Sequence, residues 1–146
     1  NILLQQRAAT KKIYPLLWDV SVAGHVNSGE SLLTAAIREV KEEIGITIGE
    51  NDLKKIGVMK SFQSYKSGII DNEFHTIFIS KLNDDIENLS PQKEEVEALK
   101  TVSISLFKKL LDDSANNSHF VTSNKEYYVF VLKKIKDFYQ KKQTIN

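Results

Sequence analysis

Cysteine is absent from the 146 residues, which excludes a disulfide framework, thiolate catalysis and a cysteine zinc site. No apolar run approaches the roughly 20 residues that span a bilayer, and the first residues lack a secretory h-region. Neither sign of charge dominates, since 20 basic and 19 acidic residues give a net charge of +1, and no overall field favours nucleic acid or an anionic membrane. We therefore expect a cytoplasmic protein in which residues 1–146 form one domain.

Strand and helix patterns follow one another along the chain, which indicates an α/β layered domain. Two β-rich segments flank a polar turn around Ser67 and Gly68, and we expect them to pair as a hairpin. A terminal helix is expected from Tyr127, Val131, Ile135 and Phe138 at helical spacing, with its lysines facing solvent. The expected strands are 1–6, 18–24, 53–62, 73–82 and 98–105, and the expected helices are 31–44, 106–111 and 125–142.

The helix at 31–44 carries an unusual density of acid. On a wheel of about 100° per residue one side is apolar, while Glu39, Glu42 and Glu43 fall on the opposite, outward side. Ser31 is a suitable N-cap, and Gly45 stands where a left-handed residue would end the helix. The apolar stripe consists of Leu33, Ala36, Ile37, Val40 and Ile44.

Two interpretations of these three glutamates remain open from the residues alone. Charged outer faces are common, so a solvated acidic surface is one of them. However, like charges at this spacing repel, and the helix dipole disfavours Glu42 and Glu43 near the C-terminus. Carboxylates at i, i+3 and i+4 are the ligands that Mg²⁺ or Mn²⁺ prefers. Arg38 could hold Glu39 by a bidentate pair, or form only a weak surface ion pair with it.

The segment 24–46 resembles the Nudix box without departure. The matching positions are Gly24, Glu30, Arg38, Glu39, Val40, Glu42, Glu43, Gly45 and Ile46. The resemblance implies a Nudix-type α/β/α sandwich with a mixed β-sheet, and a metal-dependent pyrophosphohydrolase acting on a diphosphate joined to another group, often a nucleoside.

Roles for individual residues follow from the resemblance. Glu39, Glu42 and Glu43 match metal ligands, and Glu39 matches the residue that orients or deprotonates the attacking water. Arg38 is then the residue that steers Glu39. Glu30 is implied as a supporting acid, and the carbonyl of Ala23 as a further ligand of Mg²⁺ or Mn²⁺.

The flanking sequence is similar to the branch of the superfamily that contains isopentenyl-diphosphate isomerase. Arg7 and Lys11 occupy positions that grip the substrate diphosphate there, and His25 matches a histidine that binds metal in the isomerase. Downstream, Asp71 and Glu73 resemble an acidic pair, and Glu73 is the candidate to complete the metal site. An edge-strand charge for Glu73 and a structural loop role for His25 are the alternatives.

Departures from the isomerase favour hydrolysis. The isomerase needs a cysteine where this chain has Ala23, and it has a late tryptophan where this chain has none. The family fold also places a further strand before residue 1. We expect a small-molecule diphosphate as the partner, and a homodimer is compatible with the resemblance; a non-catalytic, nucleotide-binding domain is the remaining alternative. Weaker candidates are Glu94, Glu95, Phe62 and Tyr65.

Overall fold

The computed structural model describes residues 1–65, 67–117, 119–120 and 125–143. Its central sheet has the strand order β2-β1-β5, built from β1 (Ile2–Arg7), β2 (Trp18–Asp19) and β5 (Val96–Val102). Both strand pairs are antiparallel, and Gln5 of β1 lies opposite Asp19 on one side and Leu99 on the other. A parallel bridge joins Trp18 to Phe120.

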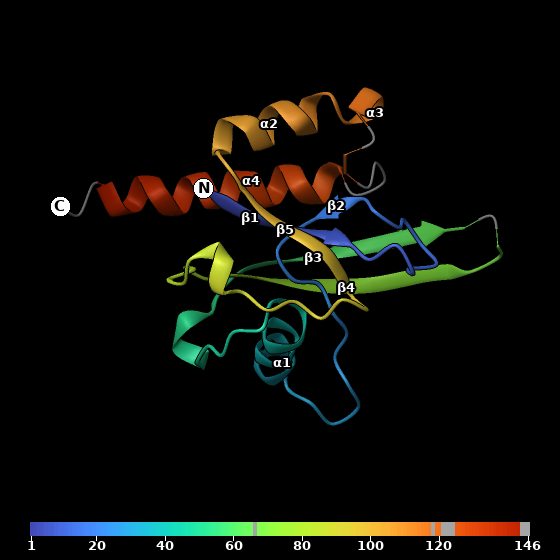
Figure 1. The fold of residues 1–146 in the computed structure, drawn as a ribbon, viewed down its shortest axis with the longest axis horizontal. Coiled ribbons are helices and arrows are strands. Elements are labelled where there is room, and N and C mark those ends of the chain that lie inside the picture. Colours follow the sequence, from blue (N-terminus) through green and yellow to red (C-terminus); the bar gives the residue numbers. More distant parts are fainter. Residues whose placement is uncertain (66, 118, 121–124, 144–146) are drawn as a thin grey trace.

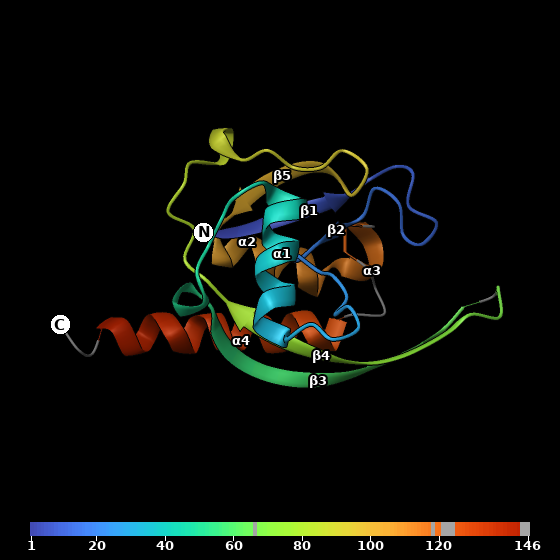
Figure 2. The same cartoon turned by 90° about the horizontal axis from the view of Figure 1, so that it is seen from below.

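Helices cover both faces of this sheet (Figures 1 and 2). Helix α1 (Leu32–Ile44) lies on one side, whereas α2 (Ile104–Asp112), α3 (Ser114–Asn117) and α4 (Lys125–Gln143) lie on the other. Two short 3₁₀ turns, η1 (Glu50–Asp52) and η2 (Ile86–Asn88), complete the chain. The expected α/β/α layering is confirmed. None of the described helices is both long enough and apolar enough to cross a membrane.

The expected hairpin is also confirmed. Strand β3 (Lys54–Ser64) pairs antiparallel with β4 (Ile70–Ile79), and Gly68 in the turn has a φ of 85°. Figure 2 shows this ribbon curving past the body of the molecule. Its outer face leaves large apolar side chains exposed, and its inner face carries Glu73 and His75. The exposed apolar residues of the outer face are Val58, Phe62, Ile70 and Phe74.

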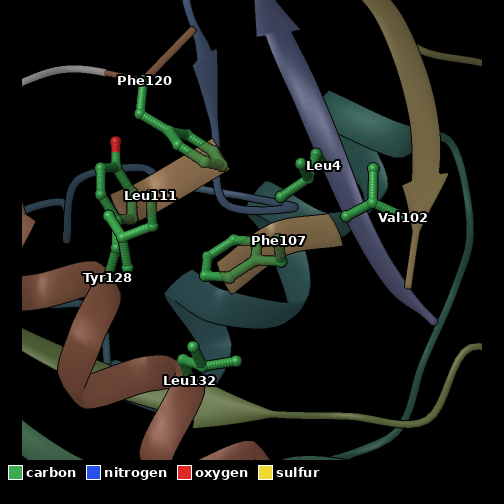
Figure 3. Packing of buried hydrophobic residues seen from close by; sticks show 7 residues of the cluster. All are labelled: Leu4, Val102, Phe107, Leu111, Phe120, Tyr128 and Leu132. Atoms are coloured by element: carbon green, nitrogen blue, oxygen red, sulfur yellow. The ribbon is translucent and has the colours of Figure 1, made fainter. Parts of the chain in front are cut away.

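Helix α4 joins the central sheet to the hairpin. Tyr128 and Leu132 belong to the main core cluster with Leu4 of β1 (Figure 3). Val131 and Ile135, on the next helical positions, pack instead against the hairpin. The expected periodicity of this helix is therefore confirmed. The remaining members of the main cluster are Val102, Phe107, Leu111 and Phe120.

Two expected strands are shorter than the sequence suggested. Only Trp18 and Asp19 of segment 18–24 pair in the sheet, because the chain then turns toward α1 and the Ala23 amide bonds a helix side chain instead. Segment 98–105 stops pairing at Val102, because the Ser103 hydroxyl accepts from the Leu106 amide at 3.0 Å and begins α2. In both places a side chain captures the backbone groups that a longer strand would have used.

Candidate active site

Helix α1 begins and ends where its cap residues dictate. The Ser31 hydroxyl accepts from the Thr34 amide at 3.1 Å, and Gly45 adopts a left-handed φ of 78° while its amide donates to Lys41 O at 3.1 Å. The last residue of the helix, Ile44, is also tied to a neighbouring loop, since the Ser90 amide donates to Ile44 O at 3.1 Å. The helix is thus a rigid support for its acidic side chains.

Arg38 is the centre of the charged cluster on α1. Its Nε and Nη2 donate to the two oxygens of Glu30 at 3.0 Å each, and Nη1 donates to Glu39 at 2.8 Å and Glu42 at 3.0 Å. Nη2 also donates to the His25 carbonyl at 2.9 Å. The hydrogen bond from Arg38 is the main reason why the pKa of Glu30 is lowered. The expected pair with Glu39 is present as a single bond, and the bidentate partner is Glu30.

Gly24 lets the loop before α1 lie directly against the Glu39 carboxylate. A Cβ at position 24 would lie 1.9 Å from Glu39 Cδ and 2.2 Å from each carboxylate oxygen. No side chain fits there while Glu39 keeps its place. Since the Glu39 side chain is only 16% exposed, its carboxylate is held between this backbone and Arg38.

Glu43 is buried, in contrast to the outward position that the helical wheel gave it. The residue is 5% exposed, and its Oε2 accepts from the Ala23 amide at 2.9 Å and from Gln5 Nε2 at 3.0 Å. Burial is the largest cause raising the pKa of Glu43 to about 7; the charges of Glu39 and Glu95 add to this, and the two hydrogen bonds oppose it.

The physical reason is that α1 is covered on two sides. Four of the five residues of the predicted apolar stripe are only half-buried, and the buried positions of the helix are Ala35, Glu43 and the fifth stripe residue, Ile44. The side chain of Gln5 and the loop amide of Ala23 cover the flank that carries Glu43. On the same wheel Glu43 falls only about 20° from Ala36, at the edge of the apolar stripe, so the outward placement of Glu43 was wrong and its burial agrees with helical geometry.

Glu73 on β4 faces the same loop. Its two oxygens lie 3.3 Å from Nε2 of His25 and 3.3 Å from Nε2 of His75. His25 is 83% exposed, so it is open to a ligand. The structure therefore brings together two of the predicted site residues, Glu73 and His25, and adds His75.

The two basic residues expected to bind substrate, Arg7 at the end of β1 and Lys11 in the loop that follows, each have a partner within the protein. Arg7 donates through Nε at 3.2 Å and Nη2 at 3.0 Å to Ile13 O. Lys11 forms an ion pair with Glu95. Glu95, one of the weaker candidates, thus pairs with Lys11, and its charge also contributes to raising the pKa of Glu43.

Other weak candidates lie around this loop or away from it. Tyr65 lies against Tyr14, with ring centroids 6.3 Å apart, and burial raises the pKa of Tyr65. Asp71 also acts on that pKa, so it lies near the same tyrosine. Phe62, in contrast, lies on the exposed outer face of the hairpin.

No three His, Asp or Glu side chains within the described residues are arranged as a ready metal-binding group. Arg38 donates hydrogen bonds to one oxygen of Glu39 and one of Glu42, while Glu43 accepts from Gln5 instead. The donor set nevertheless fits a hard divalent cation. Glu43 is a buried carboxylate near a second one, Glu39, and a cation would stabilise the two negative charges. The Glu39 carboxylate occupies the space that a Cβ at Gly24 would fill.

Two buried polar residues of this region escaped the sequence analysis. Gln5 of β1 is 4% exposed and bonds Glu43, and Asp19 of β2 is 7% exposed and accepts from Tyr128 Oη at 3.0 Å. Burial raises the pKa of Asp19. No local signal marked them, because half of the β1 residues are polar and the partners of Gln5 and Asp19 are distant in sequence.

Comparison with known proteins gives a consistent family. The sequence model of the NUDIX domain matches residues 1–123. An uncharacterised Nudix hydrolase of Clostridium acetobutylicum is 32% identical over 162 aligned residues, covering 94% of this chain and 77% of that protein. An isopentenyl-diphosphate Delta-isomerase of Corynebacterium diphtheriae is 34% identical over 103 residues, covering 68% of this chain and 54% of the isomerase. The chain thus spans about half the length of that second relative.

A solved structure shares the fold. The crystal structure of a Deinococcus radiodurans protein superposes with a TM-score of 0.61 at 20% identity, covering 86% of this chain and 71% of that one. At this level of identity the similarity concerns the arrangement of helices and strands only.

Proposed function

The chain belongs to the Nudix family, and from that premise we propose that it is a cytoplasmic, Mg²⁺- or Mn²⁺-dependent pyrophosphohydrolase. Its substrate is a nucleoside diphosphate derivative or a similar small diphosphate. The observation that carries the proposal is the Glu39 carboxylate, held by Arg38 against the Gly24 backbone and close to the buried Glu43. Such fixed geometry is what phosphoryl transfer requires of a protein.

Each acidic residue has a separate task in this proposal. Glu39, Glu42 and Glu43 would hold the cation, with the Ala23 carbonyl and Glu73 completing the set. A bound divalent cation would neutralise the diphosphate and polarise the attacked phosphorus. Because the side chains of Glu39 and Glu42 bond Arg38, cation binding would compete with these two hydrogen bonds.

Glu39 also serves as general base. It takes a proton from the attacking water while the water oxygen bonds to phosphorus and the bridging P–O bond breaks. Arg38 keeps the Glu39 carboxylate in place, and Glu30 fixes Arg38 in turn through its bidentate pair. Each residue of this series thus limits the rotation of the next.

Arg7, Lys11 and His25 are proposed to bind the diphosphate. Arg7 extends from the end of β1, Lys11 from the loop after it, and His25 from the loop before α1. Lys11 is paired with Glu95, so substrate would have to replace that partner. An anion with several oxygens can do so, because it offers more acceptors than one carboxylate.

The test is a phosphate-release assay on a panel of nucleoside diphosphate derivatives with Mg²⁺ or Mn²⁺. Glu39→Gln and Glu43→Gln should each lower kcat/KM by about 100-fold or more. The matched control is Glu50→Gln, an exposed acid of η1, which should keep wild-type activity. Turnover of any substrate with full activity in both variants of α1 would show that the assigned site is wrong.

Isomerisation of isopentenyl diphosphate is the second candidate, favoured by the similarity to the Corynebacterium isomerase. Against it, Ala23 stands where the isomerase resemblance requires cysteine, and the chain contains none. Incubation with isopentenyl diphosphate in deuterated water, followed by mass spectrometry, should show neither exchange nor product. Tight nucleotide binding by calorimetry without turnover at any metal concentration would instead favour a non-catalytic domain.

A further inference from the structure

Gln5 is a buried amide in the middle of β1. The residue is 4% exposed, and neighbouring strands pair with it on both sides, at Asp19 and Leu99. The preceding residue, Leu4, is fully buried in the core on the other face. A strand buried on both faces is normally apolar, and a polar group placed there costs free energy unless it is hydrogen-bonded. The Gln5 amide therefore requires a hydrogen-bond partner that offsets this cost.

The partner of this amide is Glu43. Gln5 Nε2 donates to Glu43 Oε2 at 3.0 Å, across 38 positions of sequence. The same oxygen accepts from the Ala23 amide at 2.9 Å. Both hydrogen bonds that the described residues make to this carboxylate end on Oε2, so Oε1 is left for a ligand. One donor comes from a central strand and one from the loop that passes Glu39.

We infer that Gln5 is a positioning residue that fixes the Glu43 carboxylate so that its other oxygen faces a divalent cation. The inference rests on the proposed function, since it assigns a role at the same site. A neutral amide suits this role because it orients the carboxylate without cancelling its charge. A lysine or arginine at position 5 would form an ion pair with Glu43 and compete with the cation.

Binding of Mn²⁺ alone to the purified chain, measured by calorimetry, tests the inference. Gln5→Met keeps the length of an unbranched side chain and removes the donor, so the dissociation constant for Mn²⁺ should rise about 10-fold. The matched control is Gln6→Met on the same strand. The Gln6 amide donates to Leu16 O at 2.9 Å rather than to Glu43, so this variant should bind Mn²⁺ as the wild type does.

A double-mutant cycle separates positioning from general damage. In a Glu43→Gln background, which has already weakened Mn²⁺ binding, adding Gln5→Met should change the dissociation constant by less than about 2-fold. Equal losses in both backgrounds would mean that Gln5 acts on the fold and not through Glu43, and the inference would be overturned. Melting curves without metal check that each variant is folded. Gln5→Asn, whose shorter amide cannot reach, should repeat the loss if Gln5→Met does not fold.

Failure of this inference differs from failure of the proposed function. Unchanged Mn²⁺ affinity in Gln5→Met, together with a strong loss in Glu43→Gln, overturns the role of Gln5 and leaves the metal site intact. A wild-type chain that binds no Mn²⁺ overturns the metal site itself, and the role of Gln5 with it.

Discussion

At Gly24 the loop before α1 lies so close to the Glu39 side chain that only a hydrogen atom fits at the Cβ position. The residue at position 24 therefore determines where the Glu39 carboxylate lies. Gly24→Ala would push a methyl group against Glu39 Cδ, which is the flexible end of a side chain. The fold can therefore survive while the carboxylate moves. On the proposed function, a displacement of about 1 Å at a reacting group costs about 100-fold in rate.

We expect Gly24→Ala to lower kcat/KM by about 100-fold with a nearly unchanged melting temperature. Gly49→Ala is the control, because the nearest atom to its new Cβ, Asp52 Oδ2, lies at an ordinary 3.5 Å. Steady-state kinetics and thermal melts of both variants check this. Wild-type kinetics in Gly24→Ala would mean that the position of the Glu39 carboxylate does not matter for turnover.

At the scale of elements, α1 depends on how it ends. Gly45 has a left-handed φ of 78°, and a Cβ there would lie 2.4 Å from Ser90 O. Both effects oppose any side chain at this position, and the second one involves backbone, which cannot easily yield. The end of α1 is therefore fixed by local conformation and by a tertiary contact together.

Gly45→Ala should lower the free energy of unfolding by about 2–3 kcal/mol. Gly68→Ala in the hairpin turn has a similar φ of 85°, but no atom of the described residues lies within 4 Å of its Cβ, so it should lose only the conformational part, about 1 kcal/mol. Urea denaturation of both variants measures the difference. Equal losses would show that the contact with Ser90 contributes nothing.

Helix α1 also shows how far sequence reasoning reaches. Its start at Ser31 and its end at Gly45 could be predicted because cap chemistry is local, and the same holds for the hairpin turn at Gly68. The acids of the candidate site were found because the box lies within one short segment. The hydrogen bond that Gln5 makes to Glu43 could not be found in this way, because Gln5 is 38 residues away.

The same limit explains the strands. Segment 18–24 has a strand-like composition, but only Trp18 and Asp19 pair, since the Ala23 amide is taken by Glu43. Whether a backbone group pairs with a strand or with a distant carboxylate depends on tertiary structure, which propensity does not encode.

At the scale of the whole molecule, His119 links segment 119–120 to the central sheet. Its ring stacks on Trp18 at a centroid distance of 5.8 Å, and Lys100 Nζ lies 2.6 Å from its Nε2. Burial, with a contribution from the charge of Lys100, lowers the pKa of His119 to about 4 from the ordinary 6.5. The folded protein therefore keeps this imidazole neutral in mildly acidic solution.

Stability should consequently fall as pH decreases from about 6.5 toward 4, because in that window the unfolded chain binds a proton at His119 that the folded chain does not. We expect a loss on the order of 2 kcal/mol, allowing for partial exposure of the ring. Urea denaturation between pH 4.5 and 7 should show a flatter dependence in His119→Gln. Equal slopes in the wild type and His119→Gln would contradict the prediction.

The hydrogen bonds of Arg38 have a kinetic consequence. The three carboxylates of Glu30, Glu39 and Glu42 surround the Arg38 guanidinium, so this cluster carries a net negative charge before a cation binds. A bare diphosphate approaching it is repelled, whereas a diphosphate already complexed with a cation is not. On the proposed function this sets the binding order. The cation binds before the diphosphate or together with it, and the metal-free diphosphate does not bind first.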